Sequence, residues 1–304
     1  MPFYKTKKNR FVDLSAVVGV LLFFALWGRG ASAREMQDST GTKVNLVDAP
    51  QRIVALAPSL GELAADFLKQ DLNRLAGVSE FTDYPPALKK LPSVGPYNHF
   101  SIEKILSLKP DLILATQDGN SKEQVLHLRE MNLPVVTVDT GSFEEIGRSI
   151  RLVSQAIGVP REGDRMVEQL NTGLDRIKKR AESRPHLKVM LQLGDDIVAG
   201  RKSFLNDALL TVGATNVYGD SNFHYPKVAL EDVLHRDPDA IVVIVFGDEM
   251  RTFEDMRTRW NRYPQLKAVK NKRIYLLRSD ALIRPTLRIL EGIALLERTL
   301  YGKD

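Results

Sequence analysis

The chain has 304 residues, enough for two ordinary domains or one large one, and its 43% hydrophobic and 27% charged residues are typical of a globular protein. The absence of cysteine excludes a disulfide scaffold, a thiolate zinc site, a cysteine nucleophile and a lipid-modified N-terminal cysteine. Most of the formal charge of +5 lies in residues 1–33, so the rest of the chain is nearly neutral and has no global electrostatic reason to bind nucleic acid.

Residues 1–33 have the layout of a secretory signal. Basic residues between Lys5 and Arg10 precede the apolar run Ala16 to Trp27, which is shorter than the roughly 20 residues that a membrane-spanning helix needs. Ala31-Ser32-Ala33 matches the small-residue pattern that signal peptidase accepts. We therefore expect cleavage after Ala33 and export to the periplasm, with a retained N-terminal anchor as the alternative.

The N-terminal block, residues 34–160, alternates predicted strands with predicted helices. Strands are expected over 52–56, 75–80, 112–115 and 134–138, and helices over 61–69, 102–108, 121–131 and 143–157. Ser59 is placed to cap the first of these helices, and two consecutive prolines make 83–86 a loop. The alternation predicts a parallel sheet with helices on both faces.

A long helix is predicted over 161–184, where Met166, Leu170, Leu174 and Ile177 form one apolar stripe. At about 1.5 Å per residue it would span roughly 35 Å, which favours a rigid connector between two α/β blocks. The C-terminal block, residues 185–304, repeats the alternation. Strands are expected over 187–193, 240–245 and 273–277, and helices over 203–212, 229–235, 252–262 and 284–301.

A twelve-residue pattern occurs once in each block. Residues 102–113 (IEKILSLKPDLI) and 230–241 (LEDVLHRDPDAI) lie 128 residues apart and share Glu, Leu, Pro, Asp and Ile at identical places. A common helix–Pro–Asp–strand junction is the alternative, but the agreement at the matching point of both blocks favours two equivalent lobes with a ligand cleft between them. The repeat puts Glu103 and Glu231 at the same early-helix position, where a two-fold symmetric partner would meet both.

Taken together, these segments resemble the periplasmic binding proteins of ABC importers that have a helical interlobe backbone, a family serving cobalamin, ferric siderophores and haem. The cobalamin-binding members are the most similar. The resemblance covers nearly the whole mature chain in order and rests on residues 52–59, 82–86, 102–115, 119–120, 124–125, 191–194, 199–200, 216, 225–239, 279–280 and 288.

The resemblance implies an α/β fold of two similar Rossmann-like lobes joined by one long helix, and a carrier that performs no catalysis. It also implies a monomer that delivers its ligand to an ABC permease dimer, with its ATPase, in the inner membrane. Glu103 and Glu231 match the glutamates that dock against permease arginines in this family. The simpler alternative is that each glutamate only favours its helix N-terminus.

The resemblance also implies a set of ligand-binding residues on the loops around the cleft. They are Ser59, Tyr84, Tyr97, His99, Asn120, His224 and Tyr225. A corrinoid is the expected ligand, with haem or a ferric siderophore on the same scaffold as the alternative, and no resident metal or cofactor. The cobalamin-binding members use several tryptophans, whereas Trp260 is the only one in the mature chain and is expected to be structural. The two histidines are axial ligands or hydrogen-bond donors in one interpretation and ordinary surface residues in the other.

One sequence segment favours an enzyme instead. Ala57-Pro58-Ser59-Leu60-Gly61 is similar to the nucleophile elbow of α/β hydrolases. Such an enzyme needs a histidine near its C-terminus, but none follows His235, and no glycine-rich phosphate-binding motif occurs. An exported hydrolase is therefore a minor alternative, and the histidines are too few in suitable places for a zinc carrier.

Overall fold

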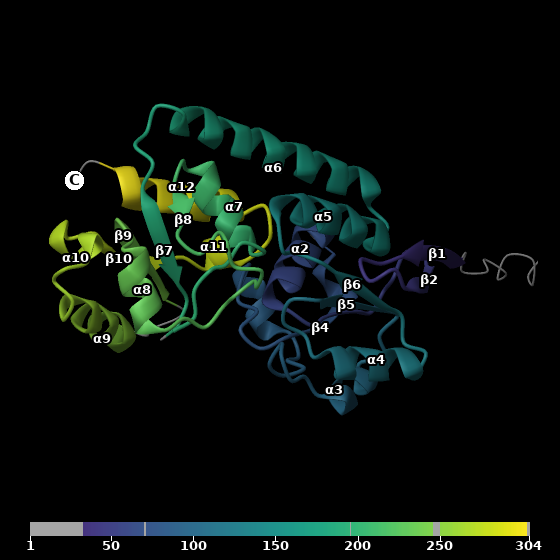
Figure 1. The fold of residues 1–304 in the computed structure, drawn as a ribbon. Coiled ribbons are helices and arrows are strands. Elements are labelled where there is room, and N and C mark those ends of the chain that lie inside the picture. The colour runs from purple at the N-terminus through teal and green to yellow at the C-terminus, as the bar shows by residue number, and fades with distance from the viewer. Residues whose placement is uncertain (1–32, 70, 195, 246–249, 303–304) are drawn as a thin grey trace, which may run out of the picture.

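The computed structural model describes residues 33–69, 71–194, 196–245 and 250–302, which form two lobes joined by a long helix (Figure 1). The expected signal lies outside the described residues except for Ala33, which begins strand β1 (Ala33–Gln37). β1 pairs antiparallel with β2 (Lys43–Val47), a hairpin that the sequence pattern did not indicate. None of the helices in these described ranges is both long enough and apolar enough to cross a membrane.

The N-terminal lobe is built on a four-stranded parallel sheet with the strand order β4-β3-β5-β6. Its strands are β3 (Ile53–Ala55), β4 (Leu75–Val78), β5 (Leu112–Thr116) and β6 (Val135–Val138). Its helices are α2 (Pro58–Leu68), η1 (Leu72–Arg74), η2 (Pro86–Lys90), α3 (Ile102–Ser107), α4 (Lys122–Glu130) and α5 (Phe143–Ile157). In Figure 1, α2 and α5 lie on one side of the sheet and α3 and α4 on the other, so β5 and β6 are buried throughout.

Helix α2 begins at Pro58, three residues before the predicted start. Its N-cap is Ala57, which makes no side-chain hydrogen bond, so the prediction that Ser59 caps this helix is wrong. Proline at the first helical position has a pre-set φ and lacks the N–H that a cap would satisfy, and Ser59 therefore falls inside the first turn. Ser101, by contrast, caps α3 and accepts a hydrogen bond from the Lys104 amide.

The connecting helix α6 (Pro160–Ala181) runs along one side of both lobes (Figure 1). It buries Leu170, Leu174 and Ile177 of the predicted stripe, whereas Met166 is only partly buried and its neighbour Val167 is buried instead. The helix packs against α5 in the N-terminal lobe and against α7 and α12 in the C-terminal lobe. One apolar face thus contributes to the core of each lobe in turn.

The C-terminal lobe repeats the architecture with the parallel strand order β8-β7-β9-β10. Its strands are β7 (Lys188–Gln192), β8 (Thr215–Asn216), β9 (Ala240–Val245) and β10 (Ile274–Arg278). Its helices are α7 (Phe204–Thr211), α8 (Leu230–Arg236), α9 (Met250–Asn261), α10 (Lys267–Lys270), α11 (Asp280–Ile283) and α12 (Ile289–Tyr301).

The single helix predicted over 284–301 is wrong, because the chain leaves the helical conformation between α11 and α12. Arg284 precedes Pro285 and is extended (φ −105°, ψ 114°), as expected for a residue whose helical conformation is disfavoured by the following proline ring. This break sends Arg284 and Arg288 toward the N-terminal lobe.

The internal repeat is confirmed as two equivalent lobes. The strand orders correspond one to one, and α3 precedes β5 as α8 precedes β9. Asp111 accepts hydrogen bonds from the Gln51 and Arg52 amides, both at 2.7 Å, and the equivalent Asp239 accepts one from Lys188 at 2.9 Å. In each lobe the repeated aspartate therefore connects the start of one strand, β5 or β9, by hydrogen bonds to the start of the neighbouring strand, β3 or β7.

Candidate functional site

The loops after the strands of the N-terminal sheet contact the C-terminal lobe. Asp83, beyond β4, lies 2.6 Å from a guanidinium nitrogen of Arg284. Asp118, after β5, lies 2.9 Å from the ring of His224. The Phe143 amide, after β6, donates to Asp207 at 2.9 Å. The carboxyl ends of the strands thus face the other lobe, which is where α/β proteins bind their ligands.

Tyr97 and Tyr225 stand at equivalent positions of the internal repeat, 128 residues apart. Tyr97 is 43% exposed and Tyr225 is 40% exposed, so both belong to the exposed large hydrophobic residues of the protein. The Tyr97 ring packs on Gly119, where an added Cβ would come within 2.8 Å of the ring. Only glycine fits there, so the backbone after β5 positions this tyrosine.

The Tyr225 hydroxyl lies close to groups from both lobes. Desolvation raises its pKa above the ordinary value, the nearby Asp118 and Tyr97 add to this rise, and a hydrogen bond with Ser203 opposes it. The phenol therefore stays protonated and neutral at any physiological pH. Tyr97 and Tyr225, from opposite lobes, thus lie close enough to interact and could contact one ligand together.

Asp118 and His224 form a contact between the lobes. The side chains are 18% and 36% exposed, and the His224 ring also lies edge-on to Tyr225, with 6.5 Å between ring centroids. Burial raises the pKa of the Asp118 carboxyl, while His224 lowers it and Asp139 raises it further. Of the two predicted histidines, the structure places His224 between the lobes, whereas His99 is exposed on the loop beside Tyr97.

Asn120 is buried, and its amide is occupied by the backbone. Its Oδ1 accepts a hydrogen bond from the Thr116 amide at 2.8 Å, and its Nδ2 donates to the carbonyl oxygens of Leu56 and Tyr97. These contacts hold the ends of β3 and β5 to the Tyr97 loop. The structure therefore gives Asn120 a positioning role, and its direct contact with a ligand stays a prediction.

Tyr84 lies beneath an arginine from the other lobe. The guanidinium carbon of Arg288 is 3.5 Å from the centroid of the Tyr84 ring, a close cation–π contact. Arg284 approaches the same loop and donates to the Phe81 carbonyl at 3.3 Å. The segment between α11 and α12 thus holds the loop that carries Tyr84.

Both arginines also reach a fully buried glutamate on α2. Glu62 accepts from Thr286 Oγ1 at 2.6 Å, from Arg288 Nη1 at 2.9 Å and from Arg284 Nη1 at 3.5 Å. One turn along α2, burial and the charge of Glu62 raise the pKa of Asp66 to about 6, while Arg288 lowers it. The C-terminal lobe is therefore ion-paired into the interior of the N-terminal lobe.

A groove of about 740 Å³ opens beside this network. Its volume falls within the range of about 300 to 1,000 Å³ that is usual for ligand pockets. It lies between η2 and the Asp83 loop of one lobe and the ends of β9, β10, α11 and α12 of the other. Its charged lining residues are Asp83, Lys89, Arg278, Asp280, Arg288, Glu291 and Arg298.

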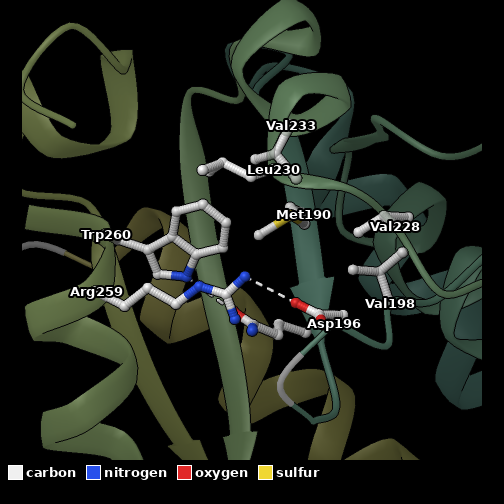
Figure 2. Close-up of a pocket in the computed structure, with 9 residues that line it drawn as sticks. Met190, Asp196, Val198, Val228, Leu230, Val233, Arg259 and Trp260 are labelled. Carbon is white, nitrogen blue, oxygen red and sulfur yellow. Dashed lines mark hydrogen bonds and ion pairs between the residues drawn. The ribbon is translucent and has the colours of Figure 1, made fainter. Parts of the chain in front are cut away.

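A second, much smaller cavity lies within the C-terminal lobe (Figure 2). Its volume of about 10 Å³ accommodates no more than a water molecule. Trp260 forms one wall and donates from Nε1 to Gln192 at 2.9 Å. This burial bears out the expectation that Trp260 is structural.

The sequence pattern missed two exposed aromatic residues on loops near the predicted site. Phe81 is 72% exposed and Phe223 is 71% exposed. Phe81 adopts a positive φ of 63°, which is strained for a residue with a side chain. Each directly precedes a residue of a predicted loop, Thr82 or His224, and this position in the sequence could have indicated an exposed aromatic residue. Ser59, the remaining predicted ligand residue, lies half-buried in the first turn of α2.

Glu103 and Glu231 are each the second residue of a short helix, α3 and α8, and both are exposed. Within the residues that the structure describes, neither takes part in an ion pair, although Ser101 donates to Glu103 at 3.2 Å. In Figure 1, α3 and α8 both lie on the side of the molecule opposite α6. Both carboxylates are thus exposed, each on a helix that lies on this side of the molecule.

The fold and the arrangement of the site define a solute-binding protein with two lobes. The family described as periplasmic binding protein matches residues 53–281, and the chain belongs to this family.

Several relatives in sequence are named for the ligand that they bind. The chain is 32% identical over 253 residues to the vitamin B12-binding protein of Vibrio vulnificus, covering 82% of this chain and 90% of that one. The corresponding protein of Pectobacterium carotovorum is 31% identical over 221 residues, covering 71% and 78%.

Solved structures have the same fold. The periplasmic vitamin B12 binding protein BtuF of Vibrio cholerae matches with a TM-score of 0.72 and 29% identity, over 83% of this chain and 96% of that one. The periplasmic heme-binding protein RhuT from Roseiflexus also matches at 0.72, over 83% and 98%. At 23% identity, this second likeness concerns the fold alone.

Proposed function

We propose that the protein captures cobalamin or a related corrinoid between its lobes and delivers it to an ABC permease. The observation that carries this proposal is the pair Tyr97 and Tyr225, two half-exposed rings from equivalent positions of opposite lobes. Aromatic faces provide large contact areas for a macrocycle and keep a polar hydroxyl for its amide side chains. The vitamin B12-binding relatives support the same ligand class.

Delivery requires a surface that recognises the permease. We assign this role to Glu103 and Glu231, because both carboxylates are exposed on the side opposite α6. A permease dimer with two-fold symmetry would present one basic group to each lobe. The protein would act as a monomer in the periplasm after cleavage behind Ala33, and the ATPase bound to the permease would drive transport.

The proposed role includes no bond chemistry. Ser59, the candidate nucleophile of the hydrolase alternative, lies in the first helical turn of α2 behind Pro58. A nucleophile elbow instead needs its serine on a sharp, strained turn between strand and helix. The local geometry therefore favours binding over hydrolysis.

Haem or a ferric siderophore is the second candidate, and the Asp118–His224 contact favours haem, whose iron accepts an axial histidine from the protein. A histidine that ligates a metal commonly has its other ring nitrogen oriented by a carboxylate. Nδ1 of His224 lies 2.9 Å from Asp118, which would leave Nε2 for an axial position on iron. Exchange of His224 for glutamine would then alter the Soret band of bound haemin.

Calorimetric titration of the exported protein with cyanocobalamin, and with haemin for comparison, tests the proposal. Sub-micromolar cobalamin binding, stronger than about −8 kcal/mol, is expected. Tyr97→Ala and Tyr225→Ala should each weaken binding about tenfold because a ring face is lost. The matched controls Tyr97→Phe and Tyr225→Phe keep the ring face and lose only the hydroxyl, so they should weaken binding less than the alanine variants do. Heat with haemin and none with cobalamin would replace the first candidate by the second.

A further inference from the structure

Three cations of the interlobe groove have no ion-pair partner within the described part of the chain. They are Lys89 of η2, Arg278 at the end of β10 and Arg298 of α12, and all three are exposed. They come from both lobes and line the same groove of about 740 Å³. Among the residues that the structure describes, the positive charge of these side chains is therefore not compensated by an ion pair.

The acidic residues of the groove do not neutralise these cations, because they are engaged elsewhere. Asp83 lies 2.6 Å and Asp280 3.7 Å from Arg284, and Glu291 lies 4.0 Å from Arg288. These two arginines also face the buried Glu62.

Arg288 also lines the groove. Its Nε is buried and lies 4.0 Å from a carboxylate oxygen of Glu291, too far for a hydrogen bond. This donor is only loosely paired, and a water or ligand oxygen would complete it.

We propose that this groove binds an anionic oxygen group carried by the ligand, with Arg278 and Arg298 as its principal contacts. Guanidinium groups match phosphate and carboxylate oxygens in charge and geometry. The volume of about 740 Å³ far exceeds that of a water molecule or a small ion, so the groove suits an arm of a large molecule. The inference rests on the proposed function and extends it to a second contact region.

The groove adjoins one predicted ligand residue through Arg288, which lines the groove and whose guanidinium covers the Tyr84 ring. A macrocycle bound at Tyr84 would therefore be able to extend a side arm toward the cations. In cobalamin the anionic group is the phosphodiester of the nucleotide loop, which cobinamide lacks. Haem offers the same chemistry through its propionate carboxylates.

Calorimetry with cyanocobalamin and dicyanocobinamide separates this contact from the aromatic one. The double variant Arg278→Gln/Arg298→Gln should bind cyanocobalamin about tenfold more weakly and cobinamide as the wild type does. The matched control is Arg161→Gln, an exposed arginine of α6 without an ion pair in the described residues. Added salt should weaken cyanocobalamin binding more in the wild type than in the double variant, because it screens exposed charges.

The outcomes distinguish the two proposals. Wild-type binding of cyanocobalamin with an unchanged affinity in the double variant would overturn the anion site and leave the proposed function standing. If the wild type binds neither corrinoid, the proposed function fails, and haemin becomes the probe for the groove. Weaker haemin binding by the double variant would then support the anion site with carboxylates as its target. Unchanged haemin binding, or a wild type that binds none of the three, would overturn it.

Discussion

Nδ1 of His224 lies 2.9 Å from Oδ1 of Asp118, and this contact joins a loop of one lobe to a loop of the other. Both side chains are partly reached by solvent, so the pair adds about 1 kcal/mol or less to the free energy of unfolding. Its position matters more than its strength, because His224 lies edge-on to the Tyr225 ring and Asp118 precedes Gly119, on which the Tyr97 ring packs. We therefore expect a change in this weak contact to alter the opening of the two lobes more than it alters the free energy of unfolding.

Asp118→Asn is therefore expected to release bound ligand faster without lowering the free energy of unfolding at pH 7. Burial raises the pKa of Asp118, so the folded state disfavours its ionised form and loses stability as pH rises through the carboxyl range. Stopped-flow dissociation and urea unfolding measure the two effects separately. His224→Gln should act like Asp118→Asn, and His127→Gln, at an exposed histidine of α4, is the matched control. Wild-type dissociation rates in both lobe-contact variants would contradict this role.

Asp66→Asn is expected to raise the free energy of unfolding at neutral pH. The pKa of Asp66 is raised from 3.8 to about 6 by burial and by Glu62, against the opposing charge of Arg288. Between these two values the folded state holds more protons than the unfolded state, so stability falls as pH rises through the window. Asparagine removes this loss and should stabilise the protein by about 1 kcal/mol above pH 7, after allowance for solvent screening.

The stability difference between Asp66→Asn and the wild type should accordingly depend on pH. It should be small near pH 4, grow through pH 6 and stay constant above pH 7, as measured by urea unfolding at each pH. Asp175→Asn, on the exposed face of α6, provides the control for a carboxylate lost without burial. A difference that does not vary with pH would show that Asp66 titrates normally.

Glu62→Ala should lower the free energy of unfolding by about 3 kcal/mol or more, because it leaves two arginines without their buried partner. Glu62 is fully buried and accepts hydrogen bonds from Thr286, Arg284 and Arg288. Glu62→Gln keeps an acceptor for Thr286 and should be less harmful. Glu130→Ala on α4, whose side chain is 75% exposed, should have almost no effect. Equal losses for Glu62→Ala and Glu130→Ala in urea unfolding would argue against the network.

The double charge reversal Glu103→Lys/Glu231→Lys should reduce transport by at least about tenfold and leave ligand affinity unchanged. Both residues are exposed on α3 and α8, and neither belongs to the interlobe ion pairs of Asp83, Asp118 and Glu62. Uptake by vesicles that contain the permease and its ATPase measures transport, and calorimetry measures affinity.

The control for the charge reversal is Glu144→Lys/Glu168→Lys, which changes the net charge equally on α5 and α6. Full transport by the Glu103→Lys/Glu231→Lys protein would exclude the proposed docking role.

Much of the architecture could be predicted because it depends on local pattern. The alternation of strands and helices, the stripe of α6 and the repeat around Glu103 and Glu231 each follow from residues close together in sequence. The predicted helix bounds were wrong where a proline sets the backbone conformation, at the start of α2 and in the break between α11 and α12. Of the predicted site residues, the structure brings together Tyr97, His224 and Tyr225, and gives Asn120 its contacts with the backbone.

Two α/β lobes, their internal repeat and the family could be inferred from the amino-acid sequence, because the hydrophobic period and the repeated motifs depend on residues close together in the chain. Which charged side chains form pairs follows from the folded structure alone. Glu62 and Arg288 are 226 residues apart, and Asp118 pairs with His224 in the other lobe. The same holds for Arg278 and Arg298, which have no ion-pair partner among the described residues, in contrast to the paired Arg284. Ion pairs depend on the distances between segments that are far apart in sequence. The periodic pattern of hydrophobic residues along one segment does not specify these distances.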